Sequence, residues 1–191
     1  MRMIAIEKHF VNSPEHIQQV ALRARRLLDR IDFRPAWRYL DVGCGVGATA
    51  CAVASGCGLE VTGIDVDPGQ IEAARARAAH PHLRFEVMDA TMLRFREAEF
   101  DIVATSMVTH HMPRWERAFS EMIRVLRRGG YLIYSDFMFP SWLAVAGSRR
   151  IPFVGFPSTK RIQSLASGAG LITVHQSRVG LRCDFIWLRN S

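Results

Sequence analysis

Lysine is almost absent from this sequence, occurring only at Lys8 and Lys160, yet arginine gives the 191 residues a formal net charge of +7. Only 23% of the residues are charged and 49% are apolar, which argues against a disordered chain and indicates a folded protein of about one domain. The positive balance is compatible with nucleic acid, a lipid headgroup or an acidic metabolite as a partner, but it identifies none of them.

Paired cysteines and long apolar runs are also missing. The four cysteines have neither the C-x-x-C spacing of a zinc site nor the density of a secreted disulfide scaffold. The N-terminus does not resemble a signal peptide, and no apolar stretch is long enough to cross a bilayer. We therefore expect a soluble, cytoplasmic protein with reduced thiols.

What the sequence does contain is a regular alternation of short apolar runs with longer helical stretches, which predicts a parallel sheet with helices on both faces. The expected strands are 37–42, 59–65, 83–89, 100–106, 131–136, 171–179 and 182–189. The expected helices are 14–31, 46–55, 69–79, 115–128 and 158–167. Asp67 should cap the third helix, Gly129 should follow the fourth, and Gly180-Leu181 should connect the last two strands as an antiparallel hairpin.

We expect a single domain in four parts. These are an N-terminal helical cap (1–34), a core (35–136), an apolar and irregular insert (137–157) and a terminal helix with its hairpin (158–191).

The stretch "LDVGCGVGATA" places Gly43, Gly45 and Gly47 in the turn after the first expected strand. In such a sheet the ligand binds at the carboxyl ends of the strands, where bare backbone allows close approach. The same letters satisfy the dinucleotide fingerprint G-x-G-x-x-G/A, with Asp65 near the distance expected of a ribose-binding acid. Two classes of cofactor therefore compete for this turn.

Two acids favour a cationic ligand over a dinucleotide. Asp41 ends the first strand, where its charge would oppose a pyrophosphate and attract a cation. Asp89 ends the third strand and can accept a hydrogen bond from an exocyclic amine. We also expect no second domain after the hairpin of the kind that usually holds a dehydrogenase's substrate.

With these motifs the sequence resembles the class I S-adenosylmethionine-dependent methyltransferases, of the type 11/25 domain, from about Asp32 onward. The motifs that carry the resemblance are "LDVGCGVG", "VTGIDVDP", "FEVMDA", "FDIVATSMVTHHM" and "RVLRRGGYLIYSD". Arg128 stands where the family usually has proline. The resemblance implies an α/β, Rossmann-like, doubly wound sheet of seven strands in the order 3-2-1-4-5-7-6, with strand 7 antiparallel, in an α/β/α sandwich.

The resemblance also implies a cofactor, S-adenosylmethionine, which leaves as S-adenosylhomocysteine. Asp65 would accept the ribose hydroxyls and Val66 would pack on the adenine, while Asp89 and Ala90 would contact the adenine edge. The loop from Gly43 through Cys44 and Gly45 to Gly47 would carry the methionine portion, with Asp41 near its positive charges. Ser106 and Met107 would lie under the methyl group.

Methyl transfer is an in-line displacement, so the enzyme chiefly aligns the acceptor and excludes water. His110 and His111 follow the fourth strand and are candidates for a general base, His110 being the nearer to the strand end. The alternative is that one of them caps or packs the helix that follows.

Missing motifs narrow the acceptor. No Asn-Pro-Pro-Tyr segment follows the fourth strand, no Pro-Cys nucleophile is present, and Asp136 alone will not hold a metal, so we expect no metal site. A small, hydrophobic or aromatic acceptor remains, and the insert, with Arg149-Arg150, suits one that carries a negative group.

Alternatives stay open. The protein could be a catalytically silent binder of the cofactor, or a lipid or RNA methyltransferase, although we do not expect a nucleic-acid partner. The arginine-rich first helix also suggests peripheral contact with a membrane, and either a monomer or a homodimer is compatible with the sequence.

Overall fold

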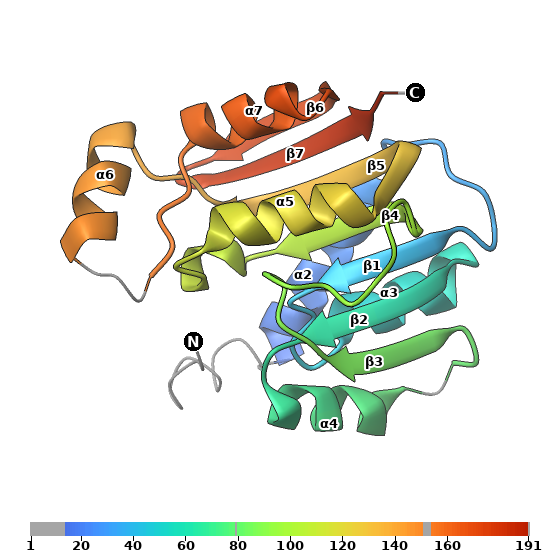
Figure 1. Cartoon of the computed structure of the whole chain (residues 1–191). Coiled ribbons are helices and arrows are strands. Elements are labelled where there is room, and N and C mark those ends of the chain that lie inside the picture. Colours follow the sequence, from blue (N-terminus) through green and yellow to red (C-terminus); the bar gives the residue numbers. More distant parts are fainter. Residues whose placement is uncertain (1–13, 79, 151–153, 191) are drawn as a thin grey trace. The chain divides into compact units, whose positions relative to one another are not determined.

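The computed structural model describes residues 14–78, 80–150 and 154–190; the side chains of 14–17, 145 and 148–150 lie outside that description. Its seven strands follow the order β3-β2-β1-β4-β5-β7-β6 (Figure 1). The pairs β1–β2, β2–β3 and β4–β5 are parallel, whereas β7 runs antiparallel to both β5 and β6. The predicted fold class, a Rossmann-like seven-stranded sheet with helices around it, is confirmed. The backbone forms two compact units, Arg2–Ala90 and Thr91–Ser191.

The N-terminal unit, Arg2–Ala90, alternates helices with strands. Its described elements are α2 (Pro14–Leu28), β1 (Arg38–Val42), α3 (Ala48–Cys57), β2 (Glu60–Asp65), α4 (Pro68–Arg77) and β3 (Leu83–Val87). The first helix ends three residues before the predicted Ile31. The Ser13-Pro14 sequence predicts Ser13 as the cap of this helix, and Ser13 lies outside the described residues. Asp67 caps α4 as predicted, because its Oδ1 accepts a hydrogen bond from the Gly69 N–H at 2.9 Å.

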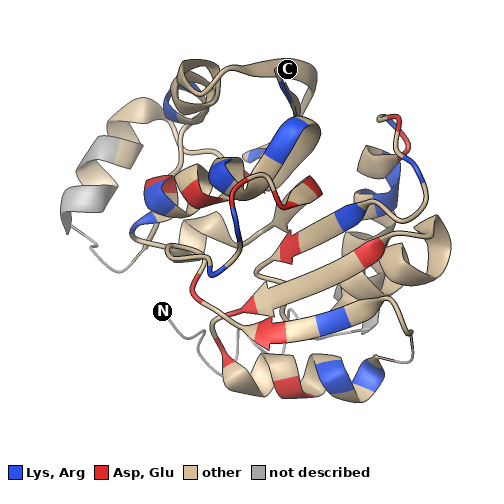
Figure 2. Cartoon of the chain, turned by 45° about the vertical axis from the view of Figure 1, so that its right-hand side comes forward, with Lys and Arg blue, Asp and Glu red and all other residues tan. Residues whose placement is uncertain are grey.

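The strands of this unit finish together. Val42 pairs with Ile64, and Asp65 pairs with Val87, so the carboxyl ends of β1, β2 and β3 form one edge. Figure 2 shows acidic residues in red where the strands of this unit end. The fold therefore gathers carboxylates at the edge where α/β sheets bind ligands.

The C-terminal unit, Thr91–Ser191, ends in the predicted hairpin. Its described elements are β4 (Phe100–Ser106), the 3₁₀ turn η1 (Thr109–His111), α5 (Trp115–Val125), β5 (Leu126–Phe137), α6 (Ser141–Arg150), α7 (Thr159–Gly168), β6 (Leu171–Val179) and β7 (Arg182–Arg189). Its core is aromatic: Trp187 lies edge-on to Phe119 and stacks on Phe185 with ring centroids 4.8 Å apart, and Tyr134 is fully buried beside them.

The end of the fourth helix was predicted wrongly. We expected it to reach Arg128, but α5 stops at Val125 and β5 begins at Leu126, which pairs with Phe100. The next pair on the ladder is Ile102 with Tyr131, so the intervening residues bulge out of the strand. Gly129 does take the left-handed conformation that we expected, with φ 69°, but it serves this bulge rather than a helix terminus.

The insert is also more regular than predicted, since 137–157 contains the helix α6. The predicted role of Arg149 and Arg150 falls on side chains outside the described part of the chain. The division of the chain into four functional parts stays a prediction.

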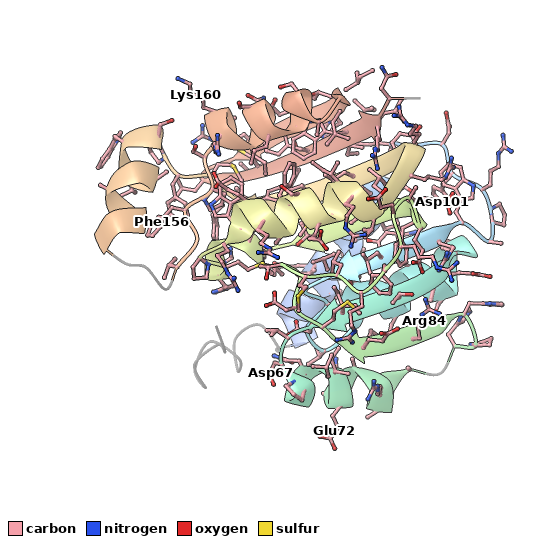
Figure 3. The ribbon with its side chains drawn as sticks, viewed as in Figure 1. Asp67, Glu72, Arg84, Asp101, Phe156 and Lys160 are labelled. Carbon is pink, nitrogen blue, oxygen red and sulfur yellow. The ribbon has the colours of Figure 1, made fainter. Side chains whose placement is uncertain are left out.

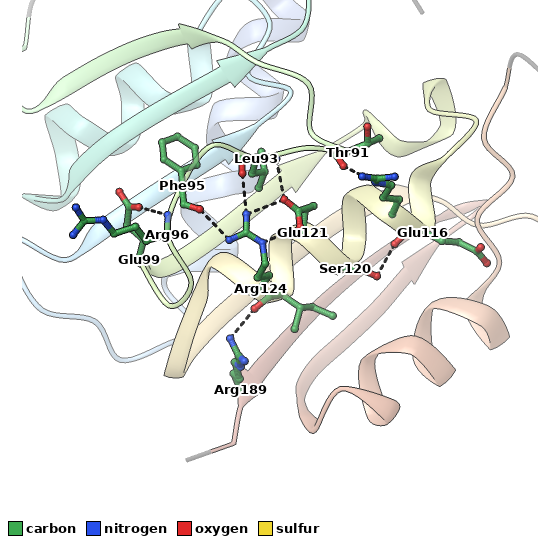
Figure 4. A network of polar contacts seen from close by, with 12 residues as sticks. Thr91, Leu93, Phe95, Arg96, Glu99, Glu116, Ser120, Glu121, Arg124 and Arg189 are labelled. Atoms are coloured by element: carbon green, nitrogen blue, oxygen red, sulfur yellow. Dashed lines mark hydrogen bonds and ion pairs between the residues drawn. The ribbon is translucent and has the colours of Figure 1, made fainter.

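The segment 91–99, which leads into β4, contains no helix. Arg124 of α5 holds this segment through hydrogen bonds to its backbone (Figure 4). Its guanidinium donates to the carbonyl oxygens of Leu93 and Phe95, both at 2.9 Å, and to the Glu121 carboxylate. Glu121 in turn accepts the Leu93 N–H at 2.9 Å. These bonds satisfy backbone groups that a helix would otherwise pair internally.

Candidate functional site

The glycine loop after β1 is fixed to the end of β2. The N–H groups of Gly43 and Cys44 both donate to the carbonyl oxygen of Ile64, at 2.8 and 2.9 Å. All three glycines of the loop have positive φ: 74° at Gly43, 54° at Gly45 and 77° at Gly47. The left-handed conformation explains why the turn uses glycine at alternate positions.

Gly45 and Gly47 differ in what surrounds them. A Cβ at Gly47 would lie 2.6 Å from the Phe85 ring, so this glycine is needed for packing between α3 and β3. A Cβ at Gly45 would meet nothing within 4 Å. Open space over Gly45 leaves room for a ligand to approach the backbone there.

Asp65 ends β2 with its carboxylate turned toward the loop. Its Oδ2 accepts the Gly45 N–H at 3.0 Å, and its Oδ1 accepts the Asp67 N–H at 2.9 Å. Burial raises the pKa of Asp65, and these two backbone N–H groups oppose that effect. Each oxygen keeps a second lone pair, so the carboxylate can still accept hydrogen bonds from the hydroxyl groups of a ligand. The neighbouring Val66 is 49% exposed, as an apolar platform for a ligand would be.

Asp41 lies in β1 and is 4% exposed. Its Oδ2 has no hydrogen-bond partner among the residues that the structure describes. Burial, reinforced by the charge of Asp65 and opposed by the N–H of Ala50, raises the pKa of Asp41 from 3.8 to about 7. An unpaired buried carboxylate is unstable unless a cation reaches it. The residues of this edge therefore fit a ligand with a positively charged group near the loop.

Asp89 and Ala90 come just beyond β3, which ends at Val87, two residues earlier than predicted. The Met88 N–H donates to the Asp65 carbonyl oxygen at 2.9 Å and keeps this segment beside the end of β2. Asp89 is exposed and Ala90 is buried. Both predicted adenine contacts thus lie on the same edge of this unit as Asp65.

In the C-terminal unit, Ser106 is the last residue of β4 and Met107 follows it with φ 57°. A left-handed conformation is strained for a residue with a long side chain, and here the Met107 N–H donates to the Ser135 carbonyl oxygen at 2.8 Å. The strain marks the point at which the chain turns from β4 into η1.

His110 and Asp136 form a hydrogen-bonded pair in this unit. The Nδ1 atom of His110 lies 2.5 Å from Oδ1 of Asp136, which is fully buried, while the histidine side chain is 15% exposed. Since a carboxylate only accepts, Nδ1 carries the proton, and Nε2 of the neutral ring is left with a lone pair. That arrangement can remove a proton from an acceptor.

Asp136 is held by many other donors. The backbone N–H groups of Val108, Thr109 and His110 and the hydroxyl of Thr109 donate to its Oδ2, and the Phe137 N–H donates to its Oδ1. These bonds fix the carboxylate in place. Sequence reasoning considered Asp136 only as a metal ligand and missed this role, although its position at the end of the strand beside β4 was a usable signal.

His111 lies next to His110 in η1, with ring centroids 3.9 Å apart. Phe137 meets the His110 ring edge-on at 5.1 Å. His110 thus contacts two rings and is also bonded to Asp136, and this bond favours His110 over His111 as the reactive histidine.

The C-terminal end of the insert (137–157) contacts the turn η1, which carries His110. The Gly155 N–H donates to the His110 carbonyl oxygen at 2.9 Å, and a Cβ at Gly155 would lie 2.2 Å from the Thr109 carbonyl oxygen. Phe156, labelled in Figure 3, packs against Phe139 at 5.2 Å. The insert is thus attached to the backbone that carries His110.

The predicted site residues fall into two groups, one in each unit. The N-terminal unit brings together Asp41, Gly43, Cys44, Gly45, Gly47, Asp65, Val66, Asp89 and Ala90, and the C-terminal unit holds Ser106, Met107, His110 and His111. Among the described residues no three His, Cys, Asp or Glu side chains are grouped so as to hold a metal ion. No helix in the described ranges has the length and apolarity needed to cross a membrane.

Known proteins resemble this chain in sequence and fold. Residues 40–134 match the family described as "Methyltransferase domain". The chain is 38% identical over 118 residues to 27-O-demethylrifamycin SV methyltransferase of Amycolatopsis mediterranei, covering 59% of this chain and 43% of that protein. It is 34% identical over 118 residues to demethylmenaquinone methyltransferase of Beutenbergia cavernae, covering 62% and 48%. The chain thus spans less than half the length of these two relatives.

A solved structure of geranyl diphosphate C-methyltransferase from Streptomyces coelicolor A3(2), in complex with Mg²⁺, geranyl diphosphate and S-adenosylhomocysteine, has the same fold. The TM-score is 0.74 at 14% identity, over 93% of this chain and 85% of that chain. From the family match and these relatives, together with the loop and acids described above, the chain belongs to the class I S-adenosylmethionine-dependent methyltransferases.

Proposed function

We propose that this protein transfers a methyl group from S-adenosylmethionine to a small apolar or aromatic acceptor. The observation that carries the proposal is the buried carboxylate of Asp41, whose Oδ2 has no partner in the described part of the chain, beside a glycine loop that is open at Gly45. A cofactor with an ammonium and a sulfonium would supply the missing positive charge. The pyrophosphate of a dinucleotide would instead add negative charge beside Asp41, which is unfavourable.

The other residues of this edge would bind the remaining parts of the cofactor. Asp65 would accept the ribose hydroxyls, Val66 would contact the adenine face, and Asp89 with Ala90 would contact the adenine edge. When bound, S-adenosylmethionine supplies an electrophilic methyl group on a sulfonium.

His110 would take the proton of the acceptor through Nε2. Asp136 would act as a positioning residue, because its bond to Nδ1 sets the tautomer and would stabilise the imidazolium that proton removal creates. Ser106 and Met107 precede this turn and would line the position of the methyl group. Proton removal matters most when the acceptor atom is a hydroxyl oxygen.

The chemistry around His110 supports an apolar acceptor. Phe137, Phe139 and Phe156 are all partly exposed, and they come from the strand end and the insert that adjoin η1. Two relatives named for acting on a rifamycin and a demethylmenaquinone point to acceptors of the same kind.

The test measures S-adenosylhomocysteine formation over a panel of phenolic, quinol and polyketide acceptors, with direct binding of S-adenosylhomocysteine measured in parallel. The proposal expects turnover on at least one hydroxylated aromatic acceptor, abolished by heat denaturation. Tight binding without turnover on any acceptor class would favour the catalytically silent binder instead.

A further inference from the structure

Gln70 is a buried side chain whose amide nitrogen, Nε2, has no hydrogen-bond partner among the described residues. The residue is 3% exposed. Native proteins rarely leave a buried donor unpaired, because the lost hydration is not replaced. The unpaired nitrogen therefore suggests a partner other than the described residues, and a bound ligand is one.

The position of Gln70 indicates where that partner lies. It belongs to the first turn of α4, five residues after Asp65, and helical spacing puts it on the same face as Ala74. The Ala74 Cβ is 3.0 Å from where a Gly47 Cβ would be, so this face of α4 borders the glycine loop. Gln70 is one turn nearer than Ala74 to the strand end that carries Asp65.

A second unpaired atom stands at the same loop. Among the described residues, three buried side-chain atoms lack a partner, and two of them, Oδ2 of Asp41 and Nε2 of Gln70, belong to the N-terminal unit. One is an acceptor and the other a donor. Both are already desolvated, as groups that bind a polar ligand are when their site is preorganised.

We propose that the Gln70 side chain donates a hydrogen bond to a ribose hydroxyl oxygen of the bound cofactor. A hydroxyl group both donates and accepts, so the ribose can donate to Asp65 while it accepts from Gln70. This inference rests on the proposed function only in taking the ligand to be S-adenosylmethionine or its product.

The test uses the variant Gln70→Leu, which keeps most of the volume and removes the donor. Two effects of opposite sign are expected. The affinity for S-adenosylhomocysteine, measured by calorimetry, falls about tenfold because a hydrogen bond is lost. The melting temperature without ligand rises by about 2–4 °C because a buried unpaired donor is gone.

The matched control is Glu72→Leu, two residues further along α4. Glu72 is exposed and points away from the strands in Figure 3, so this substitution should leave the affinity unchanged. If Gln70→Leu instead lowers the melting temperature of the free protein, Gln70 is a packing residue and the inference is wrong.

A second ligand locates the partner atom. 5′-Methylthioadenosine has the ribose but lacks the amino-acid part, so a ribose contact predicts the same fold loss for both ligands. A loss confined to S-adenosylhomocysteine would assign the contact to the methionine carboxylate, and no loss with either ligand would exclude a contact; both results overturn the inference. Failure of the unmodified protein to bind either ligand would instead overturn the proposed function.

Discussion

Nδ1 of His110 lies 2.5 Å from Oδ1 of Asp136, so the histidine is fixed by one ring nitrogen and leaves the other with its lone pair. The carboxylate is fully buried and is itself held by backbone N–H groups of the turn that carries the histidine. This pair connects the end of β5 to η1 and gives the C-terminal unit a group that can accept a proton.

Replacing His110 by alanine should lower kcat by about 10²-fold or more, because a general base typically contributes that much. Asp136→Asn should also lower kcat, since the amide cannot stabilise the imidazolium. Steady-state kinetics on a hydroxylated acceptor check both effects.

Binding of S-adenosylhomocysteine serves as the control for these variants and should not change. The double variant should be little worse than His110→Ala alone, because the two residues act as one unit. Unchanged kcat in His110→Ala would assign the histidine a packing role.

Gly155→Ala should impair catalysis without affecting the cofactor. The added Cβ would meet the carbonyl oxygens of Thr109 and Met112 at 2.2 and 2.5 Å, so the backbone at His110 must move. We expect a several-fold or larger fall in kcat with an unchanged affinity for S-adenosylhomocysteine.

Gly168→Ala is the matched control for that experiment, because a Cβ at Gly168 meets nothing within 4 Å. Equal kcat in the two alanine variants would argue against a connection between the insert and His110.

Alanine substitutions at Gly45 and Gly47 should affect ligand binding and stability differently. Gly47→Ala should lower the free energy of unfolding by at least about 2 kcal/mol, through backbone strain and the contact with Phe85. Gly45→Ala should cost roughly 1 kcal/mol through strain alone but should weaken S-adenosylhomocysteine binding, because the methyl group occupies open space over the loop. Denaturant unfolding and calorimetry measure the two quantities, and an unchanged affinity in Gly45→Ala would place the ligand elsewhere.

Asp41 should make the free protein less stable as the pH rises. Its pKa is about 7 in the folded state, above its ordinary value of 3.8, so between about pH 4 and 7 the folded protein keeps a proton that the unfolded chain releases. Stability therefore falls across that window, by roughly 4 kcal/mol at most, and the effect is complete above it. The melting temperature of Asp41→Asn should lack this fall.

Comparing the unmodified protein with Asp41→Asn from pH 5 to 8 isolates the contribution, since Asp65, whose pKa is also raised, is present in both. A difference in melting temperature that stays constant with pH would show that Asp41 does not titrate there.

The sheet could be predicted because its signals are local. Alternating apolar runs placed β4, β6 and β7 at the bounds that the structure has, and the Gly180-Leu181 connection predicted the hairpin. The start of β5 could not be read from the sequence, because "RRGG" has the composition of a helix end. Only the pairing of Leu126 with Phe100 makes it a bulged strand.

The residues of the candidate site likewise fall into those that sequence motifs identify and those that only the structure identifies. Asp41, Asp65 and the glycines lie within motifs, so spacing alone found them. Asp136 and Gln70 are ordinary residues in sequence, and what sets them apart, a buried pair with His110 in one case and an unpaired buried nitrogen in the other, depends on three-dimensional packing.

The most direct test of the central claim is calorimetric binding of S-adenosylhomocysteine to the unmodified protein and to Asp65→Ala, with Glu72→Ala as the control and the folding of each variant verified by circular dichroism. The account predicts that the protein binds S-adenosylhomocysteine in preference to NADH, and that Asp65→Ala weakens this binding about 100-fold because charge-assisted bonds to the ribose are lost. Preferential binding of NADH, or an affinity for S-adenosylhomocysteine that Asp65→Ala leaves unchanged, would contradict it.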